Sequence, residues 1–380
     1  MSSPVLTEGD SVPLLLSRPL APDSGLLQAH IATMAANARY SNMGPLHEML
    51  REALGAHLGA PHLALMANAT LGLMLALRAL KVGGEVITTP FTFAASAHAI
   101  SWAGATPVFV DVEPGGVNID AEAIAAAITP RTEAILAVHA FGLPCDCAAL
   151  QKIATQHGLA LVFDAAHAFD LRQNDQPIHR WGDATVYSTH ATKLFHTAEG
   201  GVVVSRDAEI NTAVQQLANF GFHAPGQASA IGLNAKMSEM HAALGLAVLP
   251  QVAQERAARL ALRETYSQAL AGVADITLLV ATDDCTDSAQ FLACRVADSR
   301  PESTRDEIVD DLHANGIDAR AYFNPLSSRF PHYRDSDGVR FPLPHAESAA
   351  QRVFCLPFHS GVSPRHVATI ARIIASHLGA

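Results

Sequence analysis

One lysine lies in a segment whose neighbours could support covalent chemistry. Lys193 stands in the sequence Tyr187-Ser-Thr-His-Ala-Thr-Lys193-Leu-Phe-His-Thr-Ala-Glu-Gly-Gly201, and the chain has only three other lysines. The hydroxyl, imidazole and glycine residues indicate a loop that enters an apolar strand. Desolvation lowers the pKa of a lysine amine and frees it for Schiff-base chemistry. Because most lysines are exposed, a solvated loop lysine is the alternative interpretation.

A carboxylate at the end of another apolar segment could face a cationic group. Asp164 closes the segment Ala160–Asp164 and is followed by Ala-Ala-His167. A buried carboxylate without a cationic partner is costly, so a positive charge should face Asp164. In enzymes that use pyridoxal 5'-phosphate, the protonated pyridine nitrogen is that partner. The alternative is that Asp164 only caps the helix that follows.

Two further segments could hold a phosphorylated aromatic cofactor. Asn68-Ala69-Thr70 joins an apolar segment to a helical one, so Thr70 and the first helical amides could bind a phosphate. Asn and Thr are also ordinary helix N-caps, so this signal is weak by itself. Pro90-Phe-Thr-Phe93 follows the next apolar segment, and one of its rings could either stack on a cofactor or lie in the core.

The elements that must position these residues alternate along the chain from about residue 60. Short apolar segments predict buried strands at His62–Asn68, Glu85–Thr88, Thr106–Val110, Ala134–Val138, Ala160–Asp164, Ala184–Ser188 and Gly201–Ser205. Helical spacing lies between most of them, at Thr70–Leu80, Ala94–Ala103, Ala121–Ala127 and Cys147–Gln156. The pattern predicts an α/β fold with a mainly parallel sheet covered on both faces. Ligands of such folds bind at the carboxyl ends of the strands, where Asn68, Asp164 and Ser188 fall.

The pattern changes after Pro250. A helical stretch from Gln251 to about Ala271 leads to Asp/Thr-rich turns and a helix near Ser303–Asn315. A chain of 380 residues is long enough for two domains. We therefore predict a large cofactor-binding domain at residues 1–250 and a smaller α+β domain at residues 251–380, which the long helix connects.

Composition argues against several classes of protein. Hydrophobic residues make up 49% of the chain and charged residues 16%, which is typical of a globular enzyme. Acidic residues outnumber Lys plus Arg by 36 to 25, so a nucleic-acid-binding face is not expected. Five cysteines without metal-ligand spacing indicate neither a disulfide framework nor a metal site. The chain shows no signal-peptide pattern and no apolar run of ~18 residues, so we expect a cytoplasmic protein without membrane contact.

The order of these motifs resembles the DegT/StrS group of sugar aminotransferases, within the aspartate-aminotransferase-like fold. The resemblance covers most of the chain and includes Tyr40–Pro45, Asn68–Thr70, Phe91–Phe93, Gly104–Asp111, Ile128–Thr132, Val138–Gly142, Asp164–His167, His190–Lys193, Glu199–Gly201, Gly232–Asn234, Met237–Glu239 and Leu356–Pro357. It implies that Lys193 bonds to pyridoxal 5'-phosphate and later moves a proton. Asp164 would pair with the pyridine nitrogen, His167 would lie near the phenolic oxygen, and Phe93 would stack on the ring.

The resemblance also implies how the phosphate is held. Thr70, the amide of Ala69 and Ser188 would bind it within one subunit, and Asn234 would reach it from the neighbouring subunit. The active unit would be a homodimer with shared active sites. Three features depart from the family pattern: Ala69 replaces a frequent Gly, Leu194-Phe195 stands where many members have Asn, and an Arg often found near the phosphate is either replaced by Lys236 or absent.

The run from His190 to Gly201 is most similar to enzymes that aminate the 4-position of a nucleotide-linked 4-keto-6-deoxyhexose. The implied reaction moves an amino group from L-glutamate to dTDP-4-keto-6-deoxyglucose and gives the 4-amino-4,6-dideoxy sugar. The product would serve a surface polysaccharide, such as the O-antigen of lipopolysaccharide, or a glycosylated natural product. Some relatives carry His in place of the lysine and act as dehydratases, so Lys193 favours transamination.

Several alternatives remain open at this point. The acceptor could be a 3-keto sugar or a UDP- or GDP-linked sugar, because one sequence shows no specificity pattern in the loops Tyr40–Pro45, Phe220–Ala230 and Tyr322–Ser328. A non-catalytic, cofactor-binding regulatory protein is the alternative outside enzymes. A Rossmann oxidoreductase would require a G-x-G-x-x-G motif after the first strand, and the chain has none.

Overall fold

A seven-stranded sheet forms the centre of the computed structural model, which describes residues 13–282 and 284–379. The strand order is β1-β9-β8-β5-β4-β2-β3. The bounds are β1 Leu63–Met66, β2 Glu85–Thr88, β3 Thr106–Phe109, β4 Thr132–Val138, β5 Ala160–Asp164, β8 Ala184–Ser188 and β9 Gly201–Ser205. Only β9 runs against the other strands of this sheet. The predicted α/β class with a mainly parallel sheet is confirmed, and each predicted strand lies within two residues of an observed one.

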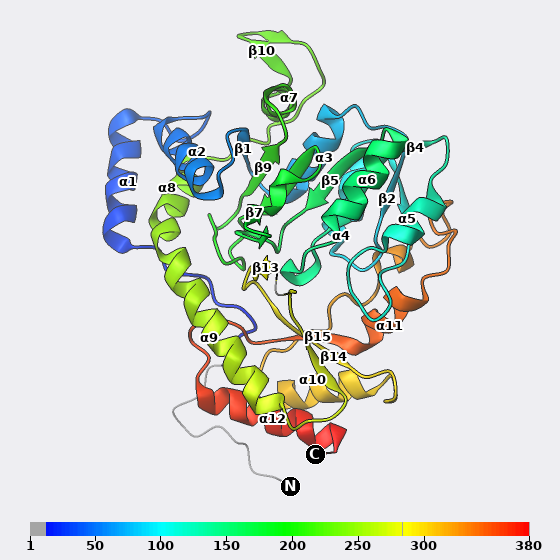
Figure 1. Cartoon of the computed structure of the whole chain (residues 1–380). Coiled ribbons are helices and arrows are strands. Elements are labelled where there is room, and N and C mark those ends of the chain that lie inside the picture. The colour runs from blue at the N-terminus through cyan, green and yellow to red at the C-terminus, as the bar shows by residue number, and fades with distance from the viewer. Residues whose placement is uncertain (1–12, 283, 380) are drawn as a thin grey trace.

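Helices cover both faces of the sheet (Figure 1). One face packs against buried side chains of α2 (Pro45–Leu58), α5 (Ala121–Ala127), α6 (Cys147–His157) and α8 (Glu239–Val248). The other face packs against α3 (Ala69–Ala79), α4 (Ala94–Trp102) and α7 (Ala208–Ala218). Helix α1 spans Ser24–Asn37. Because apolar side chains cover both faces, polar groups of the buried strands reach a ligand only at the strand ends.

The C-terminal region builds a separate core. The antiparallel strands β12 (Ile276–Leu279), β14 (Leu292–Val296) and β15 (Val353–Leu356) pack with α9 (Val252–Leu270), α10 (Thr304–Ala314) and α12 (Pro364–Leu378). Helix α9 runs from the large sheet to this core (Figure 1). Leu14, far away in sequence, pairs with Ile317 in the same region. The domain boundary at residue 250 stays a prediction.

Smaller elements join the two regions or project from them. Strand β13 (Cys285–Thr286) pairs with β6 (Arg172–Gln173), which also pairs with β7 (Gln176–Pro177). Strands β10 (Phe222–Ala224) and β11 (Gln227–Ala228) form a hairpin that extends away from the large sheet in Figure 1. Helix α11 spans Pro344–Arg352.

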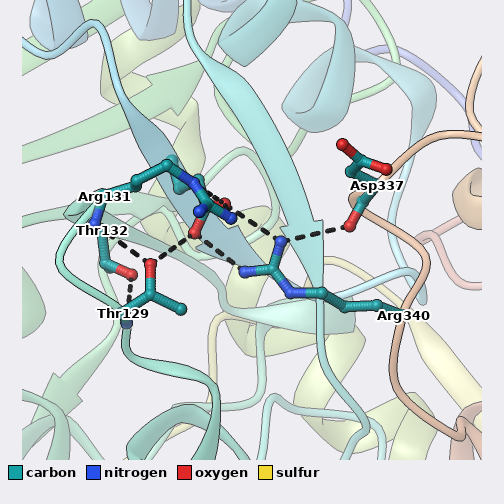
Figure 2. Close-up of polar contacts among 6 residues, drawn as sticks. Thr129, Arg131, Thr132, Asp337 and Arg340 are labelled. Carbon is teal, nitrogen blue, oxygen red and sulfur yellow. Dashed lines mark hydrogen bonds and ion pairs between the residues drawn. The ribbon is translucent and has the colours of Figure 1, made fainter.

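The segment before α11 runs along edge strand β3 and reaches the amino-terminal end of β2. The amide of Phe109, in edge strand β3, donates to the carbonyl of Gly338 at 2.9 Å. Arg340 then binds Glu85 at the start of β2, and Arg131 binds the same carboxylate (Figure 2). The contacts of Arg340 to Glu85 fasten the C-terminal region to the sheet at the edge opposite to the strand ends that carry Asp164 and Ser188.

No described helix, within residues 13–282 and 284–379, is long and apolar enough to cross a bilayer. Over the same residues, no group of three or more His, Cys, Asp and Glu side chains is arranged to bind a metal ion.

Candidate active site

A cavity of about 540 Å³ opens at the carboxyl ends of β4, β5 and β8. Its lining includes seven of the eight predicted site residues, namely Ala69, Thr70, Phe93, Asp164, His167, Ser188 and Lys193. The eighth, Asn234, is exposed and pairs with Asn219 outside this lining. One chain therefore brings together side chains that lie as much as 124 residues apart (193 − 69).

Asp164 ends β5 with both carboxylate oxygens turned to neutral donors. The Ser96 hydroxyl donates to Oδ2 at 2.7 Å and the Ala166 amide donates to Oδ1 at 3.0 Å. No cationic side chain in the described ranges forms an ion pair with it, and burial raises the pKa of Asp164 despite these hydrogen bonds and the charge of Lys193. Residues 165–171 form turns rather than a helix, so helix capping does not explain this carboxylate.

Lys193 lies in the loop between β8 and β9. The loop is closed by backbone hydrogen bonds between Thr189 and Gly200, at 3.0 Å, and between Ala191 and Ala198, at 2.7 Å. Leu194, which follows the lysine, is completely buried and anchors the loop in the core. Burial lowers the pKa of Lys193 to about 8, while Asp164 acts in the opposite direction. Lys193 is half-buried and lines the cavity, which favours the Schiff-base interpretation over that of a solvated loop lysine.

His167 stands in an aromatic wall of the cavity. Its ring stacks on those of Phe141 and Phe323, with centroids 6.5 and 6.2 Å away, and meets the edge of Phe291 at 4.7 Å. Its Nδ1 is buried and has no hydrogen-bond partner in the described chain. Burial, followed by the charge of Lys193, lowers the pKa of His167 well below its ordinary value. The ring is thus neutral and can exchange a hydrogen bond with a ligand.

The start of α3 presents a place for an anion. Asn68 is the N-cap and accepts the Leu71 amide at 2.9 Å, which leaves Ala69 and Thr70 in the first turn facing the cavity. Gly201 of β9 lies so close that an added Cβ would come within 2.6 Å of the Ala69 nitrogen. Ser188, the partner of Gly201 across β8 and β9, borders the same space. Backbone amides at a helix N-terminus and nearby hydroxyls suit a phosphate.

The two phenylalanines of the Pro90–Phe93 segment separate into two roles. Phe91 is completely buried in the core, whereas Phe93 is 62% exposed and lines the cavity at the N-cap of α4. An exposed ring beside a cavity can stack on a planar ligand. The position of Phe93 therefore favours the stacking interpretation over the core interpretation.

Sequence reasoning missed several side chains that line the cavity or support its residues. Ser96, on α4, supports Asp164, and its own hydroxyl contacts that of Thr92 at 2.8 Å. Phe291 and Arg320 come from the C-terminal region and line the cavity. Lys236, considered for the phosphate, instead donates to Asn219 at 2.9 Å and does not belong to the lining. Neither motif spacing nor periodicity carries a signal for contacts between such distant segments.

Comparison with known proteins gives consistent matches over almost the whole chain. The model of the DegT/DnrJ/EryC1/StrS aminotransferase family matches residues 25–375. A dTDP-4-amino-4,6-dideoxy-D-glucose transaminase of Escherichia coli is 36% identical over 363 residues, which cover 94% of this chain and 97% of that protein. A UDP-N-acetyl-3-dehydro-alpha-D-glucosamine 3-aminotransferase of Acidithiobacillus ferrooxidans is 34% identical over 323 residues, with 83% and 84% covered.

A solved structure agrees with these matches. DesI, crystallised in the presence of its TDP-sugar product, superimposes with a TM-score of 0.90 and 36% sequence identity. The alignment covers 97% of this chain and 93% of DesI. The similarity therefore extends over the seven-stranded sheet, the C-terminal region and the cavity between them.

Proposed function

Because the chain belongs to the DegT/DnrJ/EryC1/StrS aminotransferase family, we propose that it moves an amino group from L-glutamate to dTDP-4-keto-6-deoxyglucose. The product would be the 4-amino-4,6-dideoxy sugar, for a surface polysaccharide or a glycosylated natural product. One observation carries this choice of acceptor: the 36% identity to the Escherichia coli transaminase over nearly the full length of both chains. The 3-aminotransferase relative makes a 3-keto, UDP-linked sugar the second candidate.

The cofactor of this family is pyridoxal 5'-phosphate, and the residues present fit it. Asp164 is buried without an ion-pair partner in the described chain, and the pyridinium nitrogen would supply the missing positive charge. The Nδ1 of His167 has no hydrogen-bond partner in the described chain and would form one with the phenolic oxygen of the cofactor. Thr70, Ser188 and the amide of Ala69 would hold the phosphate. When bound, the cofactor supplies an electron sink for the carbon that loses a proton.

Lys193 supplies the amine for covalent attachment and for proton movement. With a pKa of about 8, about one amine in ten is unprotonated at pH 7, compared with fewer than about one in a thousand for an ordinary lysine. The neutral amine is the nucleophile, and once released it is a base within the cavity. Asp164 faces the same space and keeps a compensating negative charge close to the amine.

Aromatic side chains line one side of the cavity. His167, Phe291 and Phe323 pack edge to face or stacked along one side of the cavity. Because His167 is neutral, it contributes hydrogen bonding without adding a second positive charge beside Lys193. Because Asp164 is buried, its interaction with a cation is stronger than it would be in water.

Arg320 is placed to contact an anionic group of a substrate. It supplies the only guanidinium among the described cavity-lining residues. Its contacts to Asp318 and to the Tyr322 hydroxyl are all about 3.4 Å long, so it is loosely held. Guanidinium groups suit carboxylate and phosphate oxygens, and both proposed substrates carry such groups.

The active unit is a homodimer in this proposal, and Asn234 completes the phosphate site of the partner subunit. Two features support it: Asn234 is exposed outside its own cavity, and Phe220, Ile231 and Leu233 expose apolar surface close to it. Mixing Asn234→Ala with Lys193→Ala protein would form hybrids that carry both lesions in one site. The hybrid should regain activity that neither variant has alone; no recovery, or a monomeric active species in sedimentation, would contradict the shared site.

A panel of keto-sugars tests the proposed substrate. The protein, loaded with pyridoxal 5'-phosphate and supplied with L-glutamate, is offered dTDP-4-keto-6-deoxyglucose, a dTDP-linked 3-keto sugar and UDP- and GDP-linked keto-sugars. Mass spectrometry and proton NMR identify the amino sugar formed. We expect the dTDP-linked 4-keto sugar to give the highest kcat/KM and Lys193→Ala to give no product. A higher kcat/KM with a 3-keto or UDP-linked sugar would show that this sugar, and not dTDP-4-keto-6-deoxyglucose, is the preferred acceptor.

A further inference from the structure

A glutamine from the C-terminal region contacts the backbone on both sides of Lys193. The Leu194 amide donates to Oε1 of Gln290 at 2.7 Å, and Nε2 of Gln290 donates to the Thr192 carbonyl at 3.0 Å. These two backbone groups belong to the two peptide units that flank the α-carbon of Lys193. One side-chain amide therefore pairs with the lysine backbone as a neighbouring strand would.

The orientation of the Gln290 amide follows from its partners. A backbone amide can only donate and a carbonyl can only accept. With its oxygen toward Leu194 and its nitrogen toward Thr192, the side chain satisfies both groups, and the flipped orientation satisfies neither. Gln290 is 4% exposed, so water cannot readily replace either bond. The pairing is therefore both specific and costly to lose.

The segment that carries Gln290 is itself braced against the long helix α9. Arg259, which is almost fully buried, donates to the Ala289 carbonyl at 3.2 Å, and Arg256 donates to the Asp287 carbonyl at 3.0 Å. Ala289 has φ 52°, in the left-handed region that residues with a Cβ seldom adopt. Such strain persists only where the surroundings fix it. The backbone turn at Ala289 aims Gln290 at the lysine loop.

Phe291, the residue after Gln290, lies next to the amine of Lys193. The ring centroid of Phe291 lies 5.7 Å from Nζ of Lys193, and the same ring meets His167. Gln290 thus holds the backbone of Lys193, while Phe291 borders its amine. Two consecutive residues from about a hundred positions downstream contact both ends of the same side chain.

We infer that Gln290 is a positioning residue for Lys193, which fixes the lysine backbone so that the amine stays inside the cavity. This inference rests on the proposed function, because it takes Lys193 as the residue that bonds to the cofactor. The competing explanation is that Gln290 only joins two regions of the fold. The two explanations differ in what they predict for the amine itself.

Three variants separate these explanations. Gln290→Met keeps the size of the side chain and removes both hydrogen bonds. Gln290→Glu offers a rescue, because a protonated carboxyl group can donate to Thr192 and accept from Leu194, whereas the ionised group cannot donate. Gln251→Met is the matched control, since Gln251 also joins distant segments, by donating to the carbonyls of Ala21 and Ala247, but has no contact with the lysine loop.

Two measurements on apo-protein report on the lysine, and thermal unfolding reports on stability. The first is the rate constant for capture of pyridoxal 5'-phosphate, followed by absorbance, with borohydride trapping and peptide mapping. The second is the pH profile of acetylation of Lys193 by competitive labelling. In wild-type protein the labelling midpoint should lie near the lysine pKa of about 8. Trapping elsewhere than at Lys193 in wild-type protein would refute the proposed function, while the labelling profile would still test Gln290.

Gln290→Met should capture the cofactor about 10- to 100-fold more slowly, as misplacement of a reacting group does, and its labelling midpoint should rise toward that of an exposed lysine. Gln251→Met should change thermal stability alone. The capture rate of Gln290→Glu, divided by that of wild type at each pH, should approach one as the pH falls through the carboxyl pKa. The charged and titratable groups around this segment are Lys193, Asp164, His167, Arg256, Arg259, Glu255 and Asp287. Both proteins carry all of them, so dividing by the wild-type rate at each pH removes the pH dependence that the two proteins share.

Wild-type capture and labelling in Gln290→Met, with only a loss of stability like that of Gln251→Met, would overturn the inference. If Gln290→Met does not fold, Gln290→Glu alone decides, because its two protonation states compare a paired and an unpaired lysine loop in one protein. A Gln290→Glu ratio that does not vary with pH would then be the contrary result.

Discussion

Two buried carboxylates stand at opposite edges of the same sheet in opposite surroundings. Glu85 begins β2 at the amino edge, where it accepts hydrogen bonds from Arg131 and Arg340 at 2.7 to 3.0 Å (Figure 2). Thr129 adds a further bond at 2.9 Å. Asp164 ends β5 at the carboxyl edge and accepts only from neutral groups.

The pKa values of the two carboxyl groups shift in opposite directions. Hydrogen bonds from Arg340, then from Arg131 and Thr129, lower the pKa of Glu85 to about 2 although burial opposes the shift. Burial raises the pKa of Asp164, because its hydrogen bonds come without an adjacent guanidinium. At the amino edge, two guanidinium groups compensate the charge of Glu85. At the carboxyl edge, Asp164 has only neutral hydrogen-bond donors, so a bound cation is needed to compensate its charge. A buried polar group left incomplete marks a functional site.

Asp164→Asn should have the largest effect of these substitutions. The effect should be on the reaction rate and not on the stability of the protein. The glutamate half-reaction should slow by about 100- to 1,000-fold, because an electrostatic stabiliser of the charged ring is lost. Stability of the apo-protein should be unchanged or higher, since a neutral amide avoids the cost of burying a charge. Stopped-flow absorbance and denaturant unfolding measure the two quantities. An unchanged half-reaction would remove Asp164 from the active site.

Glu85→Gln should produce the converse result. The substitution keeps the shape of the side chain but removes the charge that Arg131 and Arg340 bind; the lowering of the Glu85 pKa from 4.5 to about 2 corresponds to about 3 kcal/mol of unfolding free energy. The glutamate half-reaction should stay at the wild-type rate when measured on the folded protein. Equal losses of activity in Glu85→Gln and Asp164→Asn would abolish the distinction between the two edges.

The sequence was sufficient to predict much of this contrast but not all of it. The apolar segments that end in Asn68, Asp164 and Ser188 have local patterns, so the sheet and the cavity edge could be predicted within about two residues. Lys193 could be singled out because lysine is rare and its loop is rich in hydroxyls. The same reasoning gave no role to Glu85, because a Glu at the start of a strand has no distinctive local pattern.

What could not be predicted depends on contacts between distant segments. Glu85 binds Arg340 from 255 positions away, and Gln290 reaches Leu194 from 96 positions away. Such pairs have neither a period nor a motif in one sequence, because only the folded topology brings them together. Ser96 was missed for a different reason: on an apolar helix, a serine that faces a carboxylate looks the same as one that faces the core.

The pH dependence of stability tests whether the Glu85 ion pair stabilises the folded protein. Its pKa is about 2 in the folded protein against 4.5 for an unperturbed Glu, so the folded state favours the ionised form. This contribution is fully present above about pH 5 and is lost as the pH falls toward 2, by about 3 kcal/mol in total. The stability difference between wild type and Glu85→Gln should shrink over that range in acid unfolding. A difference that is constant down to pH 2 would contradict the ion-pair origin.

Arg340→Ala should have a smaller effect than Glu85→Gln. Arg340 donates to both oxygens of Glu85 and is 26% exposed, and it fastens the segment before α11 to β2. Glu85 keeps Arg131 and Thr129 in this variant, so we expect a loss of about 2 kcal/mol, between the values for surface and buried pairs. Denaturant unfolding measures it. A loss as large as that of Glu85→Gln would mean that Arg131 contributes nothing.

Arg131→Ala should have the smallest effect at this edge. Its side chain is 70% exposed although it donates twice to Glu85, so water and salt screen the attraction. Exposed pairs contribute about 0.2–1 kcal/mol, and we expect a value in that range which falls further at 1 M salt, where the screening length is about 3 Å. The loss in Arg340→Ala should depend less on salt because that pair is more buried. If both variants lost the same stability with the same salt dependence, exposure would not decide which arginine holds Glu85, and the lowered pKa of Glu85 would belong equally to both arginines.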